Sequence, residues 1–321
     1  MMFASLLMSA VALYVVSDLD GTLVFYNNAS HHPQHGSHGS SHDAVTLELP
    51  ASSTGRIGRI SLFSFNLLTE IERLLPSRRL IIASGARAST VLQRARLLPQ
   101  FTYLICENGG RIFERDKENA SVFVEDLDFA RRHFKQGCDY ESGLAELNQF
   151  ADMCRARGLE VDGNGYVTMF RIRCRSREEE EYVIASLPSA LRHTFNLGFL
   201  DIQLNPFSKR ASVAWLLRKL EEGSEATEYF FLGDDDNDIE CAASSAEMFV
   251  ANPRSERMGD WLAASTSTAT AFTEGTDSSI SYTRATRPFC ITVPRRSLVD
   301  HDGCAANLEA LRRRVESFLN L

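Results

Sequence analysis

The sequence has no excess of positive charge and no long run of basic residues. Its 34 Lys and Arg residues are outnumbered by 42 Asp and Glu residues, which gives a formal net charge of −8. Proteins that bind nucleic acid need clustered basic side chains to meet the phosphate backbone. We therefore expect no nucleic-acid partner, and any phosphate that the protein binds needs a cation held locally for it.

The cysteines lack a pairing pattern, and a run of apolar residues long enough to span a membrane is missing. The seven cysteines are odd in number and scattered, which fits neither a disulfide framework nor a zinc-binding spacing. The apolar stretch 2–16 has no basic residues before it and is shorter than the about 20 residues that a span requires. We expect no membrane association and a reducing, cytoplasmic location.

What the sequence does contain is material for a large folded core. It has 321 residues, of which 44% are hydrophobic and 24% charged, an ordinary globular composition. This length suggests two domains, or one domain that carries a sizeable insertion.

The stretch YVVSDLDGTL, Tyr14–Leu23, carries the strongest local signal. Its apolar start predicts a buried strand, and Asp18 and Asp20 follow directly, before a Gly-Thr turn. Ligands bind beyond the carboxyl ends of parallel strands, and two carboxylates so close repel one another unless a cation or a shared proton relieves them. The alternative is an Asp-Gly turn that closes a hairpin.

The next segments predict an α/β fold with a doubly wound parallel sheet. Apolar residues at helical spacing predict a helix at Ser61–Leu75, and a strand (Arg79–Ala83), a helix (Ala88–Leu98) and a further strand (Phe101–Cys106) follow. Ser84 comes directly after the strand at 79–83. There it can either help to hold a phosphate or simply cap the helix that follows.

The pattern changes over the middle of the chain. From 108 to 205 we expect a second α/β unit, an antiparallel sheet with helices, inserted between a first core segment (1–107) and a second (206–321). The histidine-, serine- and glycine-rich segment 27–58 lies within the first core segment, and we expect it to be a mobile insertion; a zinc, nickel or copper site is the alternative.

Two charged motifs follow in the last third of the chain. Lys209 opens a predicted helix, where a positive charge opposes the helix dipole; such a conflict is typical of functional positions, although a surface lysine is the plainer interpretation. The apolar strand at 228–232 then leads into GDDDND (233–238). Four carboxylates at a strand end favour an oxygen-preferring cation such as Mg²⁺ over a solvated acidic loop.

Taken together, DLDGT, Ser84, Lys209 and GDDDND resemble the four ordered motifs of the haloacid dehalogenase (HAD) superfamily of phosphohydrolases. The position of the second unit resembles the Cof-like branch, which has a large α/β cap. The stretch Phe199–Leu220 is similar to the sugar-phosphate phosphatases, including those for sucrose phosphate and mannosyl-phosphoglycerate. SGAR at 84–87 departs from the commoner Gly-Arg after the serine, which leaves the substrate open.

The resemblance implies roles for individual residues. Asp18 would be the nucleophile that forms an aspartyl-phosphate, and Asp20 the general acid and base. Ser84 and Lys209 would bind the transferring phosphoryl group, and Asn237 would orient the loop at the phosphate. The implied Mg²⁺ ligands are Asp18, the backbone carbonyl of Asp20, and Asp234, and Asp238 would assist either as a ligand or through one.

The predicted activity is therefore Mg²⁺-dependent hydrolysis of a phosphomonoester, with a sugar phosphate as the small-molecule partner. Two alternatives stay open at this point. One is a phosphotransferase of the same fold, similar to phosphomannomutase, and the other is a non-catalytic ligand-binding protein on this scaffold.

Overall fold

A computed structural model describes much of the chain. The described residues are 14–19, 24–26, 44–48, 60–64, 80–94, 101–119, 122–133, 139–196, 198–220, 229–233, 235–245, 247–251, 257, 260–261, 281–283 and 290–293. Among the expected site residues, Asp20 and Asp234 lie outside them.

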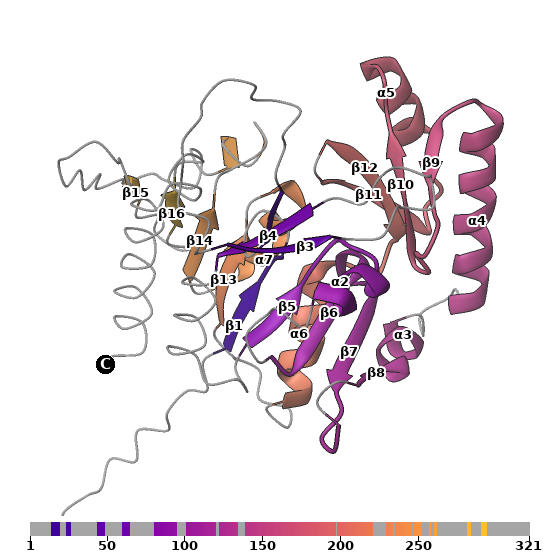
Figure 1. Ribbon diagram of the computed structural model, residues 1–321. Coiled ribbons are helices and arrows are strands. Elements are labelled where there is room, and N and C mark those ends of the chain that lie inside the picture. The colour runs from indigo at the N-terminus through magenta and orange to yellow at the C-terminus, as the bar shows by residue number, and fades with distance from the viewer. Residues whose placement is uncertain are drawn as a thin grey trace, which may run out of the picture.

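The larger layer is a nine-stranded sheet, here called the core sheet (Figure 1). In spatial order its strands are β15 (Ser281–Thr283), β16 (Cys290–Val293), β14 (Glu247–Ala251), β13 (Tyr229–Gly233), β1 (Tyr14–Ser17), β5 (Leu80–Ala83), β6 (Tyr103–Cys106), β7 (Arg111–Arg115) and β8 (Phe123–Glu125). The strands from β16 to β6 run parallel, while β15, β7 and β8 are joined in antiparallel pairs at the two edges. The expected α/β architecture is confirmed.

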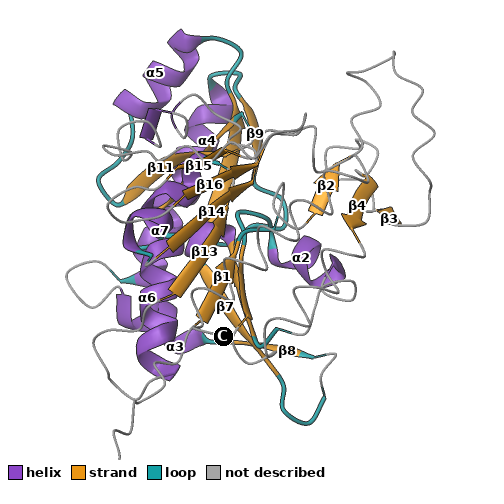
Figure 2. Ribbon diagram, turned by 90° about the vertical axis from the view of Figure 1, so that its left-hand side faces the viewer, coloured by secondary structure: helices purple, strands orange, loops and turns teal. Residues whose placement is uncertain are grey.

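The central strands are apolar throughout because both faces of the core sheet are covered. The strands β1 (YVVS), β5 (LIIA) and β6 (YLIC) are buried at every position. Figure 2 shows the helices α3 (Leu127–His133), α6 (Lys209–Leu220) and α7 (Ile239–Ser244) on one face, and α2 (Ala88–Arg94) on the other. This doubly covered sheet places the carboxyl ends of β1 and β13 side by side.

A second sheet of four strands forms a separate layer. We call residues 139–204 the four-stranded unit; its antiparallel sheet has the order β11 (Leu191–Asn196), β12 (Phe199–Leu204), β10 (Met169–Arg173), β9 (Glu160–Asp162). Its helices are α4 (Tyr140–Ala156) and α5 (Arg177–Ala185), capped at their N-termini by Asp139 and Ser176. The expected antiparallel sheet with helices is present.

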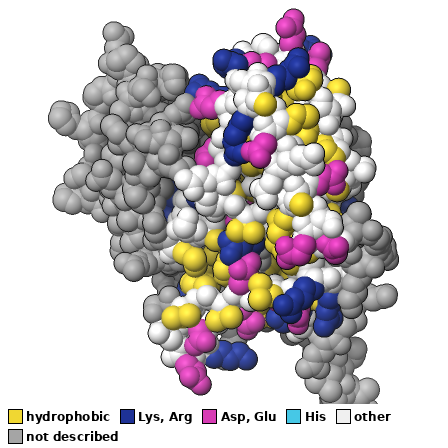
Figure 3. Space-filling model, turned by 90° about the vertical axis from the view of Figure 1, so that its right-hand side faces the viewer, with side chains coloured by type: hydrophobic (Ala, Val, Ile, Leu, Met, Phe, Trp, Pro, Cys, Tyr) yellow, Lys and Arg dark blue, Asp and Glu magenta, His cyan; other side chains and the backbone are white. Residues whose placement is uncertain are grey.

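On the outer face of this unit, charges of both signs are interspersed (Figure 3). Ion pairs one helical turn apart account for some of them, such as Arg177 with Glu181 at 2.8 Å. Both side chains of this pair are mostly exposed, so the pair adds little to stability.

The core sheet extends further along the chain than the sequence suggested. The segment 111–133, which the sequence analysis placed in the inserted unit from 108 onward, forms β7, β8 and α3 of the core layer. The physical reason is a tight turn at Glu107–Gly110, which folds β7 back antiparallel against β6. The inserted layer thus begins at the cap of α4.

A small third sheet corrects two further expectations. Its strands are β2 (Val24–Tyr26), β4 (Ile60–Ser64) and β3 (Ala44–Glu48), all antiparallel. The predicted helix at 61–75 is therefore wrong over 61–64, since these residues pair with strands distant in the sequence. The strand β3 lies inside the insertion that was expected to be mobile, and the rest of that insertion lies outside the described residues.

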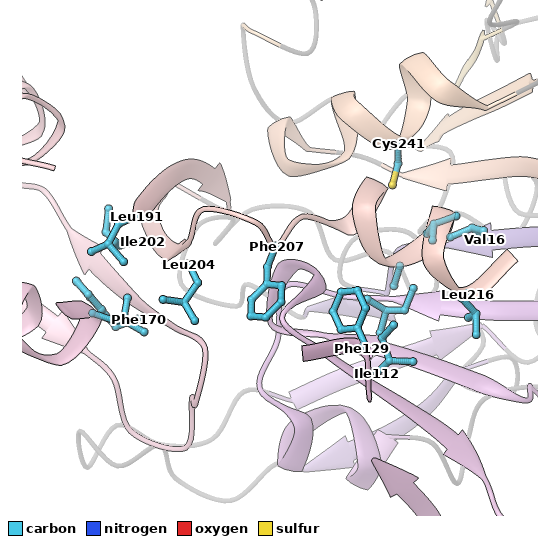
Figure 4. Packing of buried hydrophobic residues seen from close by; sticks show 14 of the residues in the cluster. Val16, Ile112, Phe129, Phe170, Leu191, Ile202, Leu204, Phe207, Leu216 and Cys241 are labelled. Atoms are coloured by element: carbon cyan, nitrogen blue, oxygen red, sulfur yellow. The ribbon is translucent and has the colours of Figure 1, made fainter. Parts of the chain in front are cut away.

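A continuous apolar core joins the two main layers. The ring of Phe207 stacks on that of Phe129 from α3, with centroids 5.4 Å apart. Figure 4 shows Phe207 between Leu204 of the four-stranded unit and Phe129 of the core layer. This aromatic contact lies directly before Lys209, so it fixes the start of α6 relative to both layers. In the part of the chain that the structure describes, no helix is long and apolar enough to cross a membrane.

Candidate active site

Three of the predicted site residues meet at the carboxyl ends of β1 and β13. The Lys209 Nζ donates to Asp18 Oδ1 at 2.6 Å and to Asp238 Oδ1 at 2.7 Å. The three residues come from distant parts of the chain, and all three are buried. The Asp18 backbone N–H also donates to the Leu232 carbonyl at 2.7 Å, which holds the end of β1 against β13.

The charges of this cluster support one another. Burial alone would lower the pKa of Lys209, but the charges and hydrogen bonds of Asp18 and Asp238 outweigh it and hold the pKa well above the usual range. Lys209 is therefore a permanent cation. The cluster pairs two carboxylates with one ammonium, and the third amino hydrogen of Lys209 has no acceptor among the described residues.

The local sequence explains why a lysine stands at this point. The helix α6 begins at Lys209, as expected, and Ser208 caps it by accepting a hydrogen bond from the Ala211 N–H at 3.1 Å. A positive charge at a helix N-terminus is unfavourable by itself. The two carboxylates offset this cost, so the conflict seen in the sequence is resolved by tertiary contacts.

The acidic loop after β13 uses its carboxylates to shape itself. Asp235 caps the short 3₁₀ turn Asp236–Asp238, and its backbone N–H donates in return to Asp238 Oδ2 at 3.2 Å. This capping box directs the other oxygen of Asp238 to Lys209. Asp235, to which the sequence assigned no catalytic part, therefore positions Asp238.

Ser84 is buried at the end of β5, where its hydroxyl oxygen accepts a hydrogen bond from the Ala86 N–H at 3.0 Å. In this arrangement the side chain stabilises the turn into α2. The backbone carbonyl of Ser84 accepts from the Asn108 N–H at 3.2 Å, which ties the turn after β5 to the turn after β6. Ser84 is not among the residues that line the cavity beside Lys209.

A cavity of about 280 Å³ opens beside Lys209, between the acidic loop and strand β11 of the four-stranded unit. It is lined by Asn108, Arg192, His193, Thr194, Gln203, Ser208, Lys209, Asp236, Asn237, Ile239, Glu240 and Arg257. Arg192 reaches across to form an ion pair with Glu240 of α7. Burial, followed by the charges of Arg257 and Arg192, lowers the pKa of His193, so its imidazole is neutral at pH 7.

The sequence analysis missed the polar residues where the two layers meet. Asp201 on β12 forms an ion pair with Arg171, with distances of 2.6 and 2.9 Å, and accepts hydrogen bonds from the side-chain amides of Asn108 and Asn196. Asn237, predicted at the phosphate, donates to Asn108 Oδ1 at 2.8 Å. The signal in the sequence was the ENGG turn at 107–110, three of whose residues the structure holds at positive φ.

That turn is conformationally costly. Glu107 and Asn108 have φ values of 54° and 51°, in a region where residues other than glycine are uncommon. The buried Glu107 carboxylate holds the turn by accepting from the N–H groups of Val167 and Thr168 and from the Thr168 hydroxyl, at 2.8–2.9 Å. The segment before β10 thus keeps Asn108 in place beside the cavity.

Only two of the four predicted metal ligands lie among the described residues. Asp18 and Asp238 lie together, whereas Asp20 and Asp234 fall outside the described residues. Among the residues that are described, no three His, Cys, Asp or Glu side chains gather in a way that could hold a metal ion.

Comparison with solved structures bears on the fold. The chain aligns with Thermoplasma acidophilum protein 0175 at 12% identity and a TM-score of 0.50, over 78% of this chain and 89% of that one. This likeness shows a shared fold. No family model and no curated protein matches the sequence.

Weaker structural likenesses include phosphatases of the superfamily that the motifs resemble. The HAD subclass IIB sugar phosphatase BT4131 aligns at 15% identity and a TM-score of 0.47, over 78% of this chain and 91% of that one. The sucrose-phosphatase of Synechocystis, solved with sucrose and phosphate, aligns at 13% identity and a TM-score of 0.48, over 78% and 87%. Both TM-scores lie below 0.5, and we base nothing about the fold or the activity of this chain on these two likenesses.

Proposed function

We propose that this protein hydrolyses a phosphomonoester, a sugar phosphate, through a phosphorylated aspartate. The observation that carries the proposal is the buried cluster of Asp18, Lys209 and Asp238 at the carboxyl ends of neighbouring parallel strands. Ligands of such sheets bind at these ends. A nucleophilic carboxylate beside a permanent cation is what phosphoryl transfer needs, because the attack brings two anions together.

The residues divide the reaction between them. An Asp18 carboxylate oxygen attacks phosphorus, the bond to the leaving oxygen breaks, and Asp20 supplies the proton that the leaving alcohol needs. Water then attacks the phosphorylated Asp18, with Asp20 taking its proton, and releases inorganic phosphate. The Lys209 ammonium would give its third hydrogen bond to a phosphoryl oxygen, where its charge offsets the charge that develops there.

The residues present also fit Mg²⁺. Asp18 and Asp238 offer carboxylate oxygens, the ligands that this ion prefers, at the same end of the core sheet. We assign its binding to Asp18, Asp20, Asp234 and Asp238. A bound Mg²⁺ would neutralise substrate charge and orient the phosphoryl group.

The cavity supports a small polar substrate. Its volume of about 280 Å³ lies near the lower end of the usual range for small-molecule sites. The four-stranded unit contributes Arg192, His193, Thr194 and Gln203 to it, which are hydrogen-bonding side chains suited to sugar hydroxyls. The leaving group would thus be recognised by the four-stranded unit and the phosphoryl group by the core sheet.

The test is phosphate release from a panel of sugar phosphates and one aryl phosphate, with Mg²⁺ and with excess chelator. We expect metal-dependent release from the wild type and none from Asp18→Asn. Asp162→Asn, which alters an ion pair away from the cavity, should retain activity. Release that survives Asp18→Asn, or no release from any compound with Mg²⁺ present, would contradict the proposal.

A further inference from the structure

A line of hydrogen bonds connects the four-stranded unit with the acidic loop of the core sheet. Asp201 Oδ2 on β12 accepts from Asn108 Nδ2 at 2.9 Å, and Asn108 Oδ1 accepts from Asn237 Nδ2 at 2.8 Å. We call these three residues the Asp201 relay. Asp201 and Asn108 are almost completely buried, so bulk water does not compete for these bonds.

The chemistry of Asp201 fixes the direction of the whole relay. Both carboxylate oxygens of Asp201 accept hydrogen bonds from the Arg171 guanidinium, so Asp201 offers only acceptors to its neighbours. Asn108 must therefore turn its amino group to Asp201 and its oxygen to Asn237. Asn237 must in turn present its amino group to Asn108. Asp201 thus decides the orientation of an amide that it does not touch.

This orientation matters because Asn237 lines the cavity together with Lys209. One hydrogen of its amino group is donated to Asn108, and the second has no acceptor within the described part of the chain. That hydrogen is available to a ligand oxygen. A flipped amide would exchange the amino group and the carbonyl oxygen, and a carbonyl oxygen in place of the donor repels a phosphoryl oxygen.

The backbone around the relay is adapted to it. A Cβ atom at Gly85 would lie 2.3 Å from Asn196 Nδ2 and 2.6 Å from Asn108 Oδ1, closer than real Cβ atoms come. The amides therefore pack directly on the glycine that follows Ser84. Asn108 itself is held at a φ of 51°, and such strain persists where the surrounding structure over-determines it.

We infer that Asp201 is a positioning residue, which acts through Asn108 to keep the amino group of Asn237 turned to the phosphoryl group of the substrate. The identity of the ligand rests on the proposed function, whereas the relay itself can be tested without any reaction. Asp201 itself is not among the residues that line the cavity.

The first experiment is an NMR measurement of the side-chain amide signals of Asn237 in the full chain. Asp201→Asn can donate or accept, so it no longer fixes the orientation of Asn108, and the signals of Asn237 should shift or divide between two orientations. The matched control is Asp162→Asn, because Asp162 pairs with Arg87 at 2.8 Å and likewise joins the two layers. The control should leave the Asn237 signals unchanged.

Asn108→Gly provides a second route if Asp201→Asn folds poorly. It removes the middle amide, leaves the pair of Arg171 with Asp201 intact and suits the positive φ. The Asn237 signals should shift in this variant too. Unchanged Asn237 signals in Asp201→Asn, or equal changes in Asp162→Asn, would overturn the inference.

The second experiment is a double-mutant cycle on phosphate release, with Asp201→Asn and Asn237→Ala alone and combined. If both act through one donor, each lowers kcat/KM about tenfold, the equivalent of one hydrogen bond, and the double variant is no worse than Asn237→Ala. Additive losses of about a hundredfold indicate separate, structural roles and overturn the inference. A wild type that releases no phosphate refutes the proposed function, and the NMR measurement still decides the relay.

Discussion

Two buried ion clusters, one in each layer of the molecule, differ in their ratio of carboxylates to cations. In the core sheet a single cation, Lys209, serves two carboxylates, Asp18 and Asp238. In the four-stranded unit a single carboxylate, Asp201, is matched by one cation, Arg171, and by two neutral amides. The printed pairs thus join two carboxylates to one cation in the first cluster and one carboxylate to one cation in the second.

We assign the cluster around Lys209 to the reaction and the cluster around Asp201 to the positioning of neighbouring side chains. Two carboxylates that share one ammonium can also offer oxygens to a bound cation such as Mg²⁺. In the second cluster the carboxylate is paired with a cation of its own. Its directional hydrogen bonds instead fix the geometry of its neighbours, here Asn108 and Asn237.

The largest expected effect comes from breaking the core cluster with Lys209→Met. Two buried carboxylates would then lose the ammonium that pairs with both of them, and we expect a loss of about 3–5 kcal/mol in the free energy of unfolding. Urea unfolding measures it. The control, Lys219→Met, removes a lysine whose side chain is 43% exposed, and it should cost far less.

The pH dependence of this loss has a definite sign. Because the folded-state pKa of Lys209 is raised above the unfolded value of 10.5, its contribution is fully present below pH 10.5. It is lost as the pH rises through the higher folded-state value. Lysine titration should therefore make no contribution between pH 7 and 9 to the difference in free energy of unfolding between the wild type and Lys209→Met. A difference that fell over that range through lysine titration would contradict the raised pKa.

The next largest loss of stability is expected at Glu107, where the core sheet meets the segment before β10. Glu107→Gln replaces an acceptor of three hydrogen bonds from Val167 and Thr168 by a side chain that also presents a donor, and we expect a loss of about 2 kcal/mol. Glu125→Gln is the matched control, since Glu125 pairs with the same Arg111 but is partly exposed. Equal losses of stability in the two variants would indicate that Glu107 stabilises the fold through Arg111 and not through Val167 and Thr168.

A substitution at Gly85 tests how tightly the amides near the Asp201 relay pack on the backbone. Gly85→Ala places a methyl group against the amides of Asn108 and Asn196, and we expect it to cost about 1–3 kcal/mol and to lower phosphate release. Gly158→Ala is the control, because its Cβ meets nothing within 4 Å and only its φ of 83° is unfavourable. That control should lower stability while phosphate release stays unchanged.

The smallest effect is expected where the two layers meet at the surface. Glu240→Gln removes the partner of Arg192, but the two side chains are 44% and 28% exposed, so water screens the pair. We expect a change below about 1 kcal/mol that shrinks further at high salt, measured by thermal unfolding at two ionic strengths. A larger, salt-independent loss would mean that this pair, and not the buried network, holds the layers together.

The residues that the sequence could identify are those whose signals are local. Asp18, Lys209 and the GDDDND loop each lie next to a recognisable strand or helix, and the parallel order of the strands was enough to place them at one edge. The α/β fold is confirmed for the same reason. The roles assigned to these residues, and those of Asp20 and Asp234, remain predictions.

What the sequence could not reveal depends on contacts between distant residues. Asn108 and Asp201 are 93 residues apart, and neither belongs to a pattern that predicts a buried amide beside a carboxylate. The hairpin that adds β7 to the core sheet depends on two residues at positive φ, Glu107 and Asn108, which are not glycines. Strand β4 was mistaken for the start of a helix because its partners, β2 and β3, come from other segments.

The most direct measurement is to find where the phosphoryl group goes during a single turnover. The wild type would be mixed with the best substrate of the panel and Mg²⁺, quenched in acid and digested, and its peptides analysed by mass spectrometry. Transfer to Asp18 predicts one phosphorylated peptide, containing residue 18, that is absent from Asp18→Asn. A phosphorylated peptide without residue 18, or turnover that continues in Asp18→Asn, would contradict the role given to the buried cluster of Asp18, Lys209 and Asp238.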